Sequence, residues 1–467
     1  MGIVYPSRTC EGETVVAKET KERQYLDTAF LKLTTADVVY PSRGVEMRVL
    51  VLGSGAKDHA VTWWFSQSRL IDGLFVAPGN VGTEQIAMNL PTVNPSSSEE
   101  VYQACLDNSI NFVFVGTEAP LFTGVIDYLN DRGIATFGAP GRALKLEGDR
   151  CFARAFTDRH NIPTPAHHLF SDEESLANFL KRHPGERFVL KRNALAPSRV
   201  MVDSSDFDVL MDFARNMMQQ DSILVEEHLT GLPVTITVLV DNNGYLMLPI
   251  CSDYMKAEEG EGGLPTGGMG SISPVPLTAQ YRSQIIDYII KPTLYGMKVE
   301  RMAYKGVLTF SLILANDGPM LVDYHVRFND PAAQAIIPLI KSDIVEILEA
   351  MNNDTLSEFK LDVSNWSAVA VVIASKGYPE KPQIGKEVKP IQSALKDNVF
   401  LTTPLLFFGA VAQNGDRIIT SGGRCLTVVG MGENIIEANQ YAYEAVEQIH
   451  FDGAWYRKDI GNRFFEN

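Results

Sequence analysis

The chain has 467 residues, 45% hydrophobic and 21% charged, a composition typical of a soluble globular protein with roughly two to four domains. Its formal net charge of −16 argues against nucleic-acid binding, because no basic field offsets phosphate repulsion. No apolar run approaches the ~18 residues that span a bilayer, so we expect no membrane partner. The five cysteines are far apart and form no CxxC pair, which is typical of reduced thiols in a cytoplasmic protein.

Residues 1–46 differ from the rest of the sequence. They mix acidic and basic side chains, and they contain neither a periodic apolar face nor the apolar segment of a signal peptide. We expect a loosely ordered extension here, with the first domain beginning at Met47.

The next segment has the pattern of a strand, a glycine turn and a helix that begins near Lys57. Gly53 and Gly55 make the turn, which lets backbone N–H groups approach a phosphate at a helix N-terminus. Two glycines alone are weak evidence, because a tight strand–helix connection explains them equally well. Two later strands run into turns at Asn80 and Glu118. The carboxyl ends of strands in a doubly wound sheet share one crevice, so all four residues would line it.

Six motifs follow one another along the chain: GSGAKDHA, VAPGNVGT, GTEAPL, LEGDRCFARAF, TGGMGSISP and RFNDP. With these motifs the chain resembles a divergent member of the phosphoribosylamine–glycine ligase family (glycinamide ribonucleotide synthetases) of the ATP-grasp superfamily. The resemblance implies an α/β fold with an N-terminal doubly wound (pre-ATP-grasp) domain, a two-lobed ATP-grasp core and a small C-terminal domain. We assign these to residues 47–148, 149–365 and 366–467, with the lid at about 165–240.

The resemblance also implies an activity, because the family joins a carboxylate to an amine through an acyl phosphate made from ATP. Phosphoryl transfer relies on positioning and charge neutralisation, so cations, metal ions and backbone donors must surround the triphosphate. We therefore expect ATP with Mg²⁺ or Mn²⁺ as cofactors. The expected substrates are a phosphosugar amine and an amino acid or similar acid, bound by a monomer or small homo-oligomer.

The amine side of the expected pocket matches the family closely. The substrate-binding residues implied there are Gly53, Gly55, Asn80 and Glu118. Lys57 and Asp58 stand where the family has arginine and glutamate, and both replacements keep the charge. A phosphosugar pocket is one interpretation of this match. The alternative is that these turns persist only as corners of the fold.

The nucleotide side departs further from the family. The ATP-binding residues implied by the resemblance are Arg150, Lys191, Arg199, Glu226, Glu227 and Leu229. Arg150 replaces a lysine and exchanges a compact ammonium for a planar fork. In the lid, Pro197 and Val200 stand in place of glycines whose backbone can close on phosphate. A valine in a left-handed conformation costs about 1–2 kcal/mol. Leu232 and Pro233 replace an acidic pair that holds ribose.

The segment LVDYHVRFNDPAAQ carries the expected metal site. Asp323 and His325 alternate with apolar residues, so on a strand both side chains point the same way. They occupy the family's two magnesium-binding positions, and an imidazole ligand would favour Mn²⁺ over Mg²⁺. The alternative is an aspartate hydrogen-bonded to a half-buried histidine, with no metal. Arg327 and Asp330 match family residues and are, with Lys256, the candidates for catalysis.

The segment around the TGGMG turn is implied to form the acid-substrate side. It keeps Asp253 and Gly268, both expected to bind substrate. Tyr254 and Pro265 replace the histidine and the asparagine that the family has there. These replacements leave the identity of the acid open.

The C-terminal part carries little chemistry, since residues 420–432 suggest a hairpin and residues 433–449 an amphipathic helix. Three functions remain open: an ATP-grasp carboxylate–amine ligase, which we favour, a nucleotide-impaired homologue that binds a phosphosugar or a partner, and a nicotinamide oxidoreductase. The last rests on the GSG turn alone. Retention of Arg150, Lys191, Asp323 and Arg327 favours the ligase, whereas loss of the lid glycines favours the impaired homologue.

Overall fold

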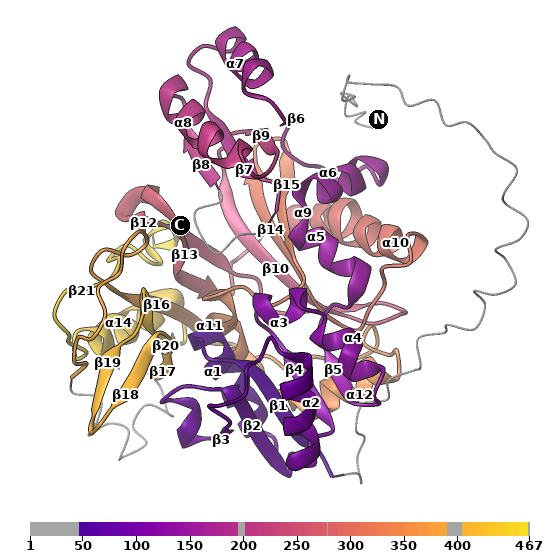
Figure 1. The fold of residues 1–467 in the computed structure, drawn as a ribbon, viewed down its shortest axis with the longest axis vertical. Helices are drawn as coiled ribbons and strands as arrows, with labels where there is room; N and C mark the ends of the chain where they lie inside the picture. Colours follow the sequence, from indigo (N-terminus) through magenta and orange to yellow (C-terminus); the bar gives the residue numbers. More distant parts are fainter. Residues whose placement is uncertain (1–45, 195–200, 278, 390–403, 466–467) are drawn as a thin grey trace, which may run out of the picture.

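The computed structural model describes residues 46–194, 201–277, 279–389 and 404–465 (Figure 1). Nearly all of the predicted N-terminal extension lies outside the described residues, as do Pro197, Arg199 and Val200 of the predicted lid. Within the described part of the chain, no helix has the length and apolarity needed to cross a membrane.

The first unit is a five-stranded parallel sheet in the order β3-β2-β1-β4-β5, drawn in indigo and purple in Figure 1. Its strands are β1 (Arg48–Gly53), β2 (Gly73–Pro78), β3 (Met88–Asn89), β4 (Phe112–Val115) and β5 (Ala135–Phe137). Its helices are α1 (Ala56–Ser66), η1 (Thr83–Gln85), α2 (Ser98–Asp107), α3 (Glu118–Phe122), α4 (Val125–Asn130) and η2 (Gly141–Leu144).

After Arg48, strand β1 is apolar and buried because both faces of this sheet are covered. Val49 and Val51 belong to one buried cluster with residues of α1, whereas Leu50 and Leu52 belong to another with residues of α2 and α4. The strand order reverses at β1, whose neighbours are β2 and β4. In such sheets ligands bind at this reversal, beyond the carboxyl ends of the strands. The turn at Gly53 lies at that end.

A second unit, the lid lobe, comprises the described residues 167–194 and 201–227. Its antiparallel sheet has the order β6-β9-β7-β8 and lies at the top of Figure 1. Its elements are β6 (His167–Phe170), α7 (Glu173–Arg182), β7 (Phe188–Arg192), β8 (Met201–Ser204), α8 (Phe207–Met218) and β9 (Ile223–Glu227). The lobe buries its own apolar cluster, which includes Leu176, Leu190, Leu210 and Val225. It is therefore a packing unit of its own.

The centre of the molecule is an antiparallel sheet in the order β11-β10-β14-β15. Its strands are β10 (Leu232–Val240), β11 (Tyr245–Met247), β14 (Gly306–Ala315) and β15 (Gly318–His325). The helical segments of this part of the chain are α5 (Lys145–Gly148), α6 (Arg150–Arg159), α9 (Ala279–Ile285), η4 (Ile286–Ile290), α10 (Lys291–Val299), α11 (Ala332–Ile336), η5 (Ile337–Leu339) and α12 (Ile344–Asn352).

The last sheet joins a mid-chain hairpin to the C-terminal strands, in the order β12-β13-β16-β20-β17 with β21 beside β16. Its strands are β12 (Ser252–Glu258), β13 (Gly262–Ser273), β16 (Ser367–Ser375), β17 (Leu405–Phe408), β20 (Arg424–Gly432) and β21 (Ala454–Trp455). Short helices η3 (Glu259–Glu261) and η7 (Asn462–Phe464) and the hairpin β18 (Val411–Asn414) and β19 (Arg417–Thr420) accompany it. The hairpin β12–β13 is thus fixed to the C-terminal part by pairing between β13 and β16.

The structure corrects one C-terminal prediction and confirms another. The predicted hairpin at 420–432 is wrong, because β20 pairs with β16 and β17 while β19 pairs with β18. All but the first residue of β20 are buried, as expected for a strand with a neighbour on each side. The predicted amphipathic helix is confirmed as α14 (Ile435–Val446).

Candidate active site

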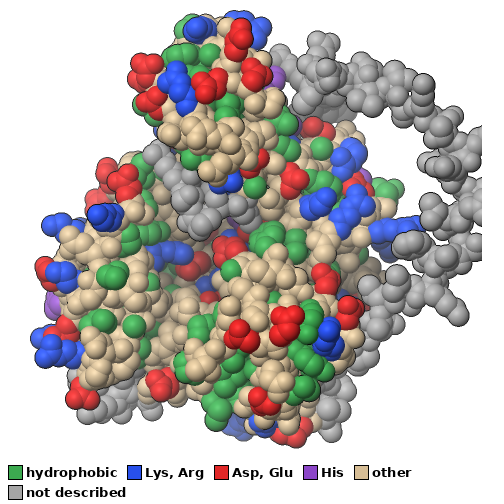
Figure 2. Space-filling model, in the orientation of Figure 1, with side chains coloured by type: hydrophobic (Ala, Val, Ile, Leu, Met, Phe, Trp, Pro, Cys, Tyr) green, Lys and Arg blue, Asp and Glu red, His purple; other side chains and the backbone are tan. Residues whose placement is uncertain are grey.

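A cavity of about 810 Å³ lies where the N-terminal sheet, the central sheet and the hairpin β12–β13 meet. Figure 2 shows a hollow near the middle of this face, with acidic and basic side chains in its walls. Nine predicted site residues line the cavity: Gly53, Gly55, Glu118, Arg150, Asp253, Asp323, His325, Arg327 and Asp330. The structure therefore brings together residues from turns that are far apart in the sequence.

The remaining predicted site residues that the structure describes lie outside this lining: Asn80, Lys191, Glu226, Glu227, Leu229, Lys256 and Gly268. Glu227 is exposed and accepts a hydrogen bond from the Ala166 N–H. Gly268 has φ +108°, and a Cβ there would lie 2.6 Å from the Asp330 carbonyl oxygen. Glycine is therefore required at position 268 for the close approach of β13 to the turn after β15.

The glycine turn after β1 is shaped by a buried carboxylate. Gly53 has φ +147°, and a Cβ on it would lie 2.2 Å from Asp58 Oδ2. The Gly55 N–H donates to the same carboxylate at 2.9 Å. Burial is the largest effect on Asp58 and raises its pKa to about 6. Asp58 thus fixes the turn through contacts that leave no room for a side chain at position 53.

The side chain of Asn80 is already engaged in hydrogen bonds with the backbone of neighbouring turns. Its side-chain amide donates to the carbonyls of Ser54 (2.9 Å) and Phe408 (2.7 Å), and its Oδ1 accepts from the N–H groups of Gly82 and Thr83. These bonds tie the turn after β2 to the turn after β1 and to β17 of the C-terminal part. The contacts favour the interpretation of Asn80 as a corner of the fold.

We expect Asn80→Ala to lower stability by about 1–3 kcal/mol, because buried backbone partners lose their hydrogen bonds. The melting temperature should fall, whereas the rise caused by added ribose 5-phosphate should be kept. Asn94→Ala is the control, since Asn94 accepts from the Ser96 N–H in an exposed turn. Loss of the ligand-induced rise without a lower melting temperature would contradict this assignment and support direct binding.

Arg327 is held by two carboxylates. Its Nη2 lies 2.5 Å from Glu118 Oε1 and 2.9 Å from Glu147 Oε1. The other oxygen of Glu147 accepts from the Val326 N–H at 2.9 Å, and His325 Nδ1 lies 3.3 Å from Oε1. Burial acts to raise the pKa of Glu147, but Arg327 and then His325 outweigh it and lower the pKa to about 2. The sequence predictions missed Glu147, although it stands in the LEGDR motif.

Lys191 lies beneath the cavity in a buried charge network. Its side chain is 1% exposed, and Nζ lies 2.9 Å from Glu226 Oε2 and 3.0 Å from Asp323 Oδ2. Arg154, a second residue that the sequence predictions missed, donates from Nε to Glu226 Oε1 at 2.6 Å. Arg150 Nε lies 3.7 Å from Asp323 Oδ1. Burial acts to raise the pKa of Asp323, but Lys191, then Arg150, outweighs it and holds the pKa well below its usual range.

The basic side chains that line the cavity are Lys57, Arg150, Arg154, Arg327 and Arg424. Each of the four arginines contacts a carboxylate, with Arg424 Nη1 3.1 Å from Asp330 Oδ1. Lys57 is 5% exposed and forms no ion pair with any described residue. Its pKa is lowered, first by burial and then by Arg327. The carboxylates of Asp58, Glu118 and Asp330 act in the opposite direction on this pKa, so Lys57 lies among acidic side chains of the cavity.

The metal assignment depends on Asp323 and His325. Among the described residues, no three His, Cys, Asp or Glu side chains gather closely enough to hold a metal ion. Mg²⁺ bound with a nucleotide often takes one or two protein carboxylates and completes its shell with phosphates and water. Asp323 lines the cavity and fits that role, but both ring nitrogens of His325 already face Glu147 and Ser311 (3.3 and 3.1 Å). The geometry supports Asp323 more than His325.

Three family descriptions match consecutive parts of the chain. They are the N domain of phosphoribosylglycinamide synthetase (residues 47–147), its ATP-grasp (A) domain (148–333) and its C domain (368–463). A phosphoribosylamine–glycine ligase of Caldanaerobacter subterraneus subsp. tengcongensis is 34% identical over 424 residues, which cover 89% of this chain and 99% of that protein. The chain belongs to the phosphoribosylglycinamide synthetase family.

Two further comparisons agree with this family. The trifunctional purine biosynthetic protein adenosine-3 of Gallus gallus is 34% identical over 426 residues, and the chain spans 42% of its length. A crystal structure of phosphoribosylamine–glycine ligase from Thermotoga maritima has 27% sequence identity and a TM-score of 0.74, covering 89% of this chain and 100% of that one. The predictions of family, α/β ATP-grasp fold and ATP-dependent ligase class are confirmed.

Proposed function

We propose that this member of the phosphoribosylglycinamide synthetase family joins the amine of a phosphosugar amine to the carboxylate of glycine or a similar small amino acid. ATP would donate its γ-phosphoryl group to the carboxylate. The amine nitrogen would then attack the acyl carbon, lose a proton and displace phosphate, leaving an amide and ADP. The observation that carries the proposal is the convergence of the glycine turn, the β15 turn and Asp253 on one cavity.

The residues suit distinct tasks within this reaction. The turn at Gly53 and Gly55 borders the part of the cavity proposed for the sugar phosphate, and Lys57 lines the same part. Arg327 is positioned by Glu118 and Glu147, so its guanidinium can stabilise negative charge that develops on the acyl phosphate. Asp330 is held by Arg424 from the C-terminal part.

For the nucleotide, we propose contacts from Arg150, Lys191, Arg199 and the hinge residues Glu226 to Leu229. A divalent metal, Mg²⁺ or Mn²⁺, bound through Asp323 would neutralise charge on the phosphates. The oxygen ligand favours Mg²⁺, whereas the predicted preference for Mn²⁺ depends on a free nitrogen of His325.

We also propose a cytoplasmic location, because the four cysteines in the described part of the chain are free thiols. We further propose a monomer or small homo-oligomer, with the domain limits given above.

A nucleotide-impaired homologue is the second candidate, and the buried charge network favours it. Lys191 is 1% exposed and already contacts Glu226 and Asp323, so it must leave one carboxylate to reach a phosphate. The loss of desolvated ion pairs in such a rearrangement is costly. Weak nucleotide binding with intact phosphosugar binding would be the signature of this candidate.

We expect calorimetric titration to detect ATP binding that requires Mg²⁺ or Mn²⁺, and thermal-shift assays to show stronger protection by ribose 5-phosphate than by glycine. ADP release, assayed with the phosphosugar amine and a panel of amino acids, should depend on both substrates. Phosphosugar protection without ATP binding or ADP release would replace the ligase proposal by the impaired homologue. Equal protection by glycine and ribose 5-phosphate would contradict the amine-side assignment.

A further inference from the structure

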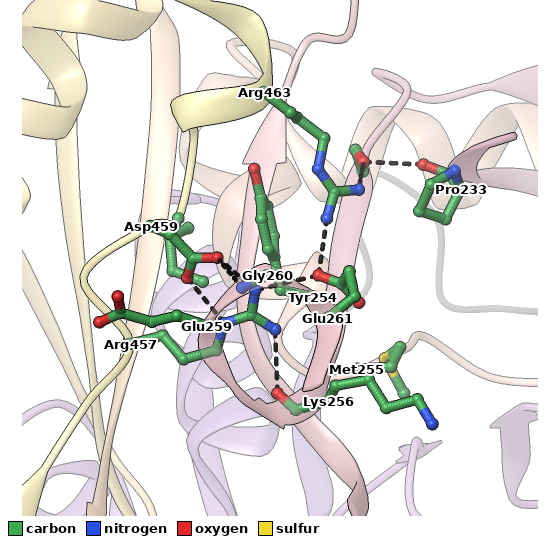
Figure 3. Close-up of polar contacts among 12 residues, drawn as sticks. Pro233, Tyr254, Met255, Lys256, Glu259, Gly260, Glu261, Arg457, Asp459 and Arg463 are labelled. Carbon is green, nitrogen blue, oxygen red and sulfur yellow. Dashed lines mark hydrogen bonds and ion pairs between the residues drawn. The ribbon is translucent and has the colours of Figure 1, made fainter. Parts of the chain in front are cut away.

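Residues 457–463, here called the tail clamp, hold the hairpin β12–β13 through hydrogen bonds and ion pairs (Figure 3). Arg457 lies at its centre with a side chain that is 1% exposed. Its guanidinium donates to the Lys256 carbonyl at 3.0 Å, to Glu261 at 3.0 Å and from Nε to Asp459 at 2.8 Å. The Gly260 N–H donates to Asp459 at 3.0 Å. One buried cation thus joins both ends of the hairpin turn to the tail clamp.

Tyr254 adds two more contacts between the hairpin and the tail clamp. The Gly461 N–H donates to its hydroxyl at 2.8 Å, and the guanidinium carbon of Arg463 lies 3.9 Å from its ring centroid. Its neighbours Asp253 and Met255 line the cavity, whereas Tyr254 does not. Alternate residues of a strand face opposite sides, so the clamp holds one face of β12 while the other face forms the cavity wall. The tyrosine that replaces the family's histidine is therefore a docking point for the tail clamp.

Lys256 connects this clamped hairpin to the lid lobe. Its carbonyl is held by Arg457, and in Figure 3 its side chain extends away from the clamp. Its Nζ lies 3.4 Å from Asp203 Oδ2 on β8. Asp203 also forms a pair within the lid lobe, with Arg187 Nε and Nη2 at 2.7 and 3.0 Å. His228 Nε2, just after β9, lies 3.9 Å from Asp203 Oδ2. Asp203 therefore has partners in or beside the lid lobe and one partner, Lys256, on the hairpin β12–β13.

We propose that Lys256 and Asp203 form a latch that holds the lid lobe against the clamped hairpin. Lys256 is then a positioning residue, which acts through the lid lobe. This role agrees with its absence from the cavity lining. The lid lobe has its own apolar cluster, so a few polar contacts between it and the hairpin β12–β13 can shift its orientation without unfolding it. The inference rests on the proposed function, because the lid would close over bound ATP.

The test compares Lys256→Gln, Asp203→Asn, the double variant and the charge exchange Lys256→Asp with Asp203→Lys. Because the pair is partly exposed, each single variant should raise the KM for ATP by about two- to fivefold, with a smaller change in kcat. The double variant should be no worse than Asp203→Asn alone, since Lys256→Gln removes only a contact that Asp203→Asn has already removed. The charge exchange should restore attraction between positions 203 and 256, but it also places a lysine beside Arg187, so its KM should lie between those of the native chain and Asp203→Asn only at high salt, where that repulsion is screened. Arg187→Gln is the matched control, because it removes a partner of Asp203 within the lid lobe and leaves the contact with Lys256 in place.

A second measurement does not need turnover. Fluorescent labels at the exposed positions Glu174 in the lid lobe and Glu444 in α14, each replaced by cysteine in a variant without other cysteines, report their separation. Energy transfer should fall in Lys256→Gln and Asp203→Asn and stay unchanged in Arg187→Gln. This readout separates failure of the latch from failure of the proposed ligase activity.

Three outcomes would overturn the latch. The first is additive effects in the double variant, and the second is equal effects in Arg187→Gln and Lys256→Gln. The third is a loss of kcat of a hundredfold in Lys256→Gln but not in Asp203→Asn, which would make Lys256 a catalytic residue as first predicted.

Discussion

Asp323→Asn should slow ADP release by about a hundredfold or more. The amide keeps the shape of the side chain but removes the charge that faces Lys191 Nζ at 3.0 Å and Arg150 Nε at 3.7 Å. It also removes the carboxylate proposed to hold the metal ion. Both losses leave the charge of the transferring phosphoryl group less well neutralised. The measurement is the steady-state rate of ADP release with the phosphosugar amine and glycine.

Two controls make this result specific. Asp287→Asn also changes a carboxylate to an amide, but Asp287 pairs with Lys291 on an exposed helix surface at 2.7 Å. That variant should turn over normally. Melting temperatures of both variants would show whether lost activity reflects lost folding. A folded Asp323→Asn variant with unchanged ADP release would remove Asp323 from the nucleotide site.

Glu147→Gln should give the largest loss of stability. The fall in the pKa of Glu147 from an ordinary 4.5 to about 2 corresponds to about 3 kcal/mol, at about 1.4 kcal/mol for each tenfold change in affinity for protons. The neutral amide cannot balance the charge of Arg327, and its NH₂ group cannot accept from the Val326 N–H. A buried guanidinium is then left with one carboxylate, that of the half-exposed Glu118.

The pH dependence gives the sign of this effect. Because the pKa of Glu147 is lower in the folded protein, its stabilising contribution is complete above pH ~4.5 and is lost as the pH falls toward 2. The melting temperatures of the native chain and Glu147→Gln should therefore differ most near pH 7 and converge below pH 4.5. Glu84→Gln, at an exposed side chain, should track the native chain throughout. A difference that stays constant down to pH 2.5 would show that the Glu147 charge is not the cause.

Short sequence patterns predicted those features of the molecule that depend on residues close together in the chain. The turn at Gly53 requires glycine because its φ is positive, and Asp323 and His325, two positions apart on β15, both line the cavity. The order of the motifs added the long-range arrangement that periodicity cannot give. The hairpin predicted at residues 420–432 is wrong even though turn residues do separate β19 from β20. The two strands pair with different neighbours, which no local pattern encodes.

For a related reason, the sequence did not predict which charged side chains form pairs in the folded protein. Glu147 and His325 are 178 positions apart, and Lys191 and Asp323 are 132 apart. Each of these side chains has the chemistry of a ligand contact, and only the folded arrangement shows that another part of the chain already occupies it. Asn80 illustrates the same ambiguity, since an asparagine at a strand end can bind a ligand or fasten a turn.

The tail clamp also orders events during synthesis of the chain. Arg457 is made 201 residues after Lys256, whose carbonyl it holds. On the ribosome the hairpin β12–β13 therefore exists for that interval without the cation that its turn folds around, and for the first part of it without β16 (Ser367–Ser375), the strand beside β13. At about 5–20 residues per second this interval lasts about 10–40 seconds. The nascent wall of the cavity is thus an exposed, half-built sheet edge, the kind of surface that chaperones shield.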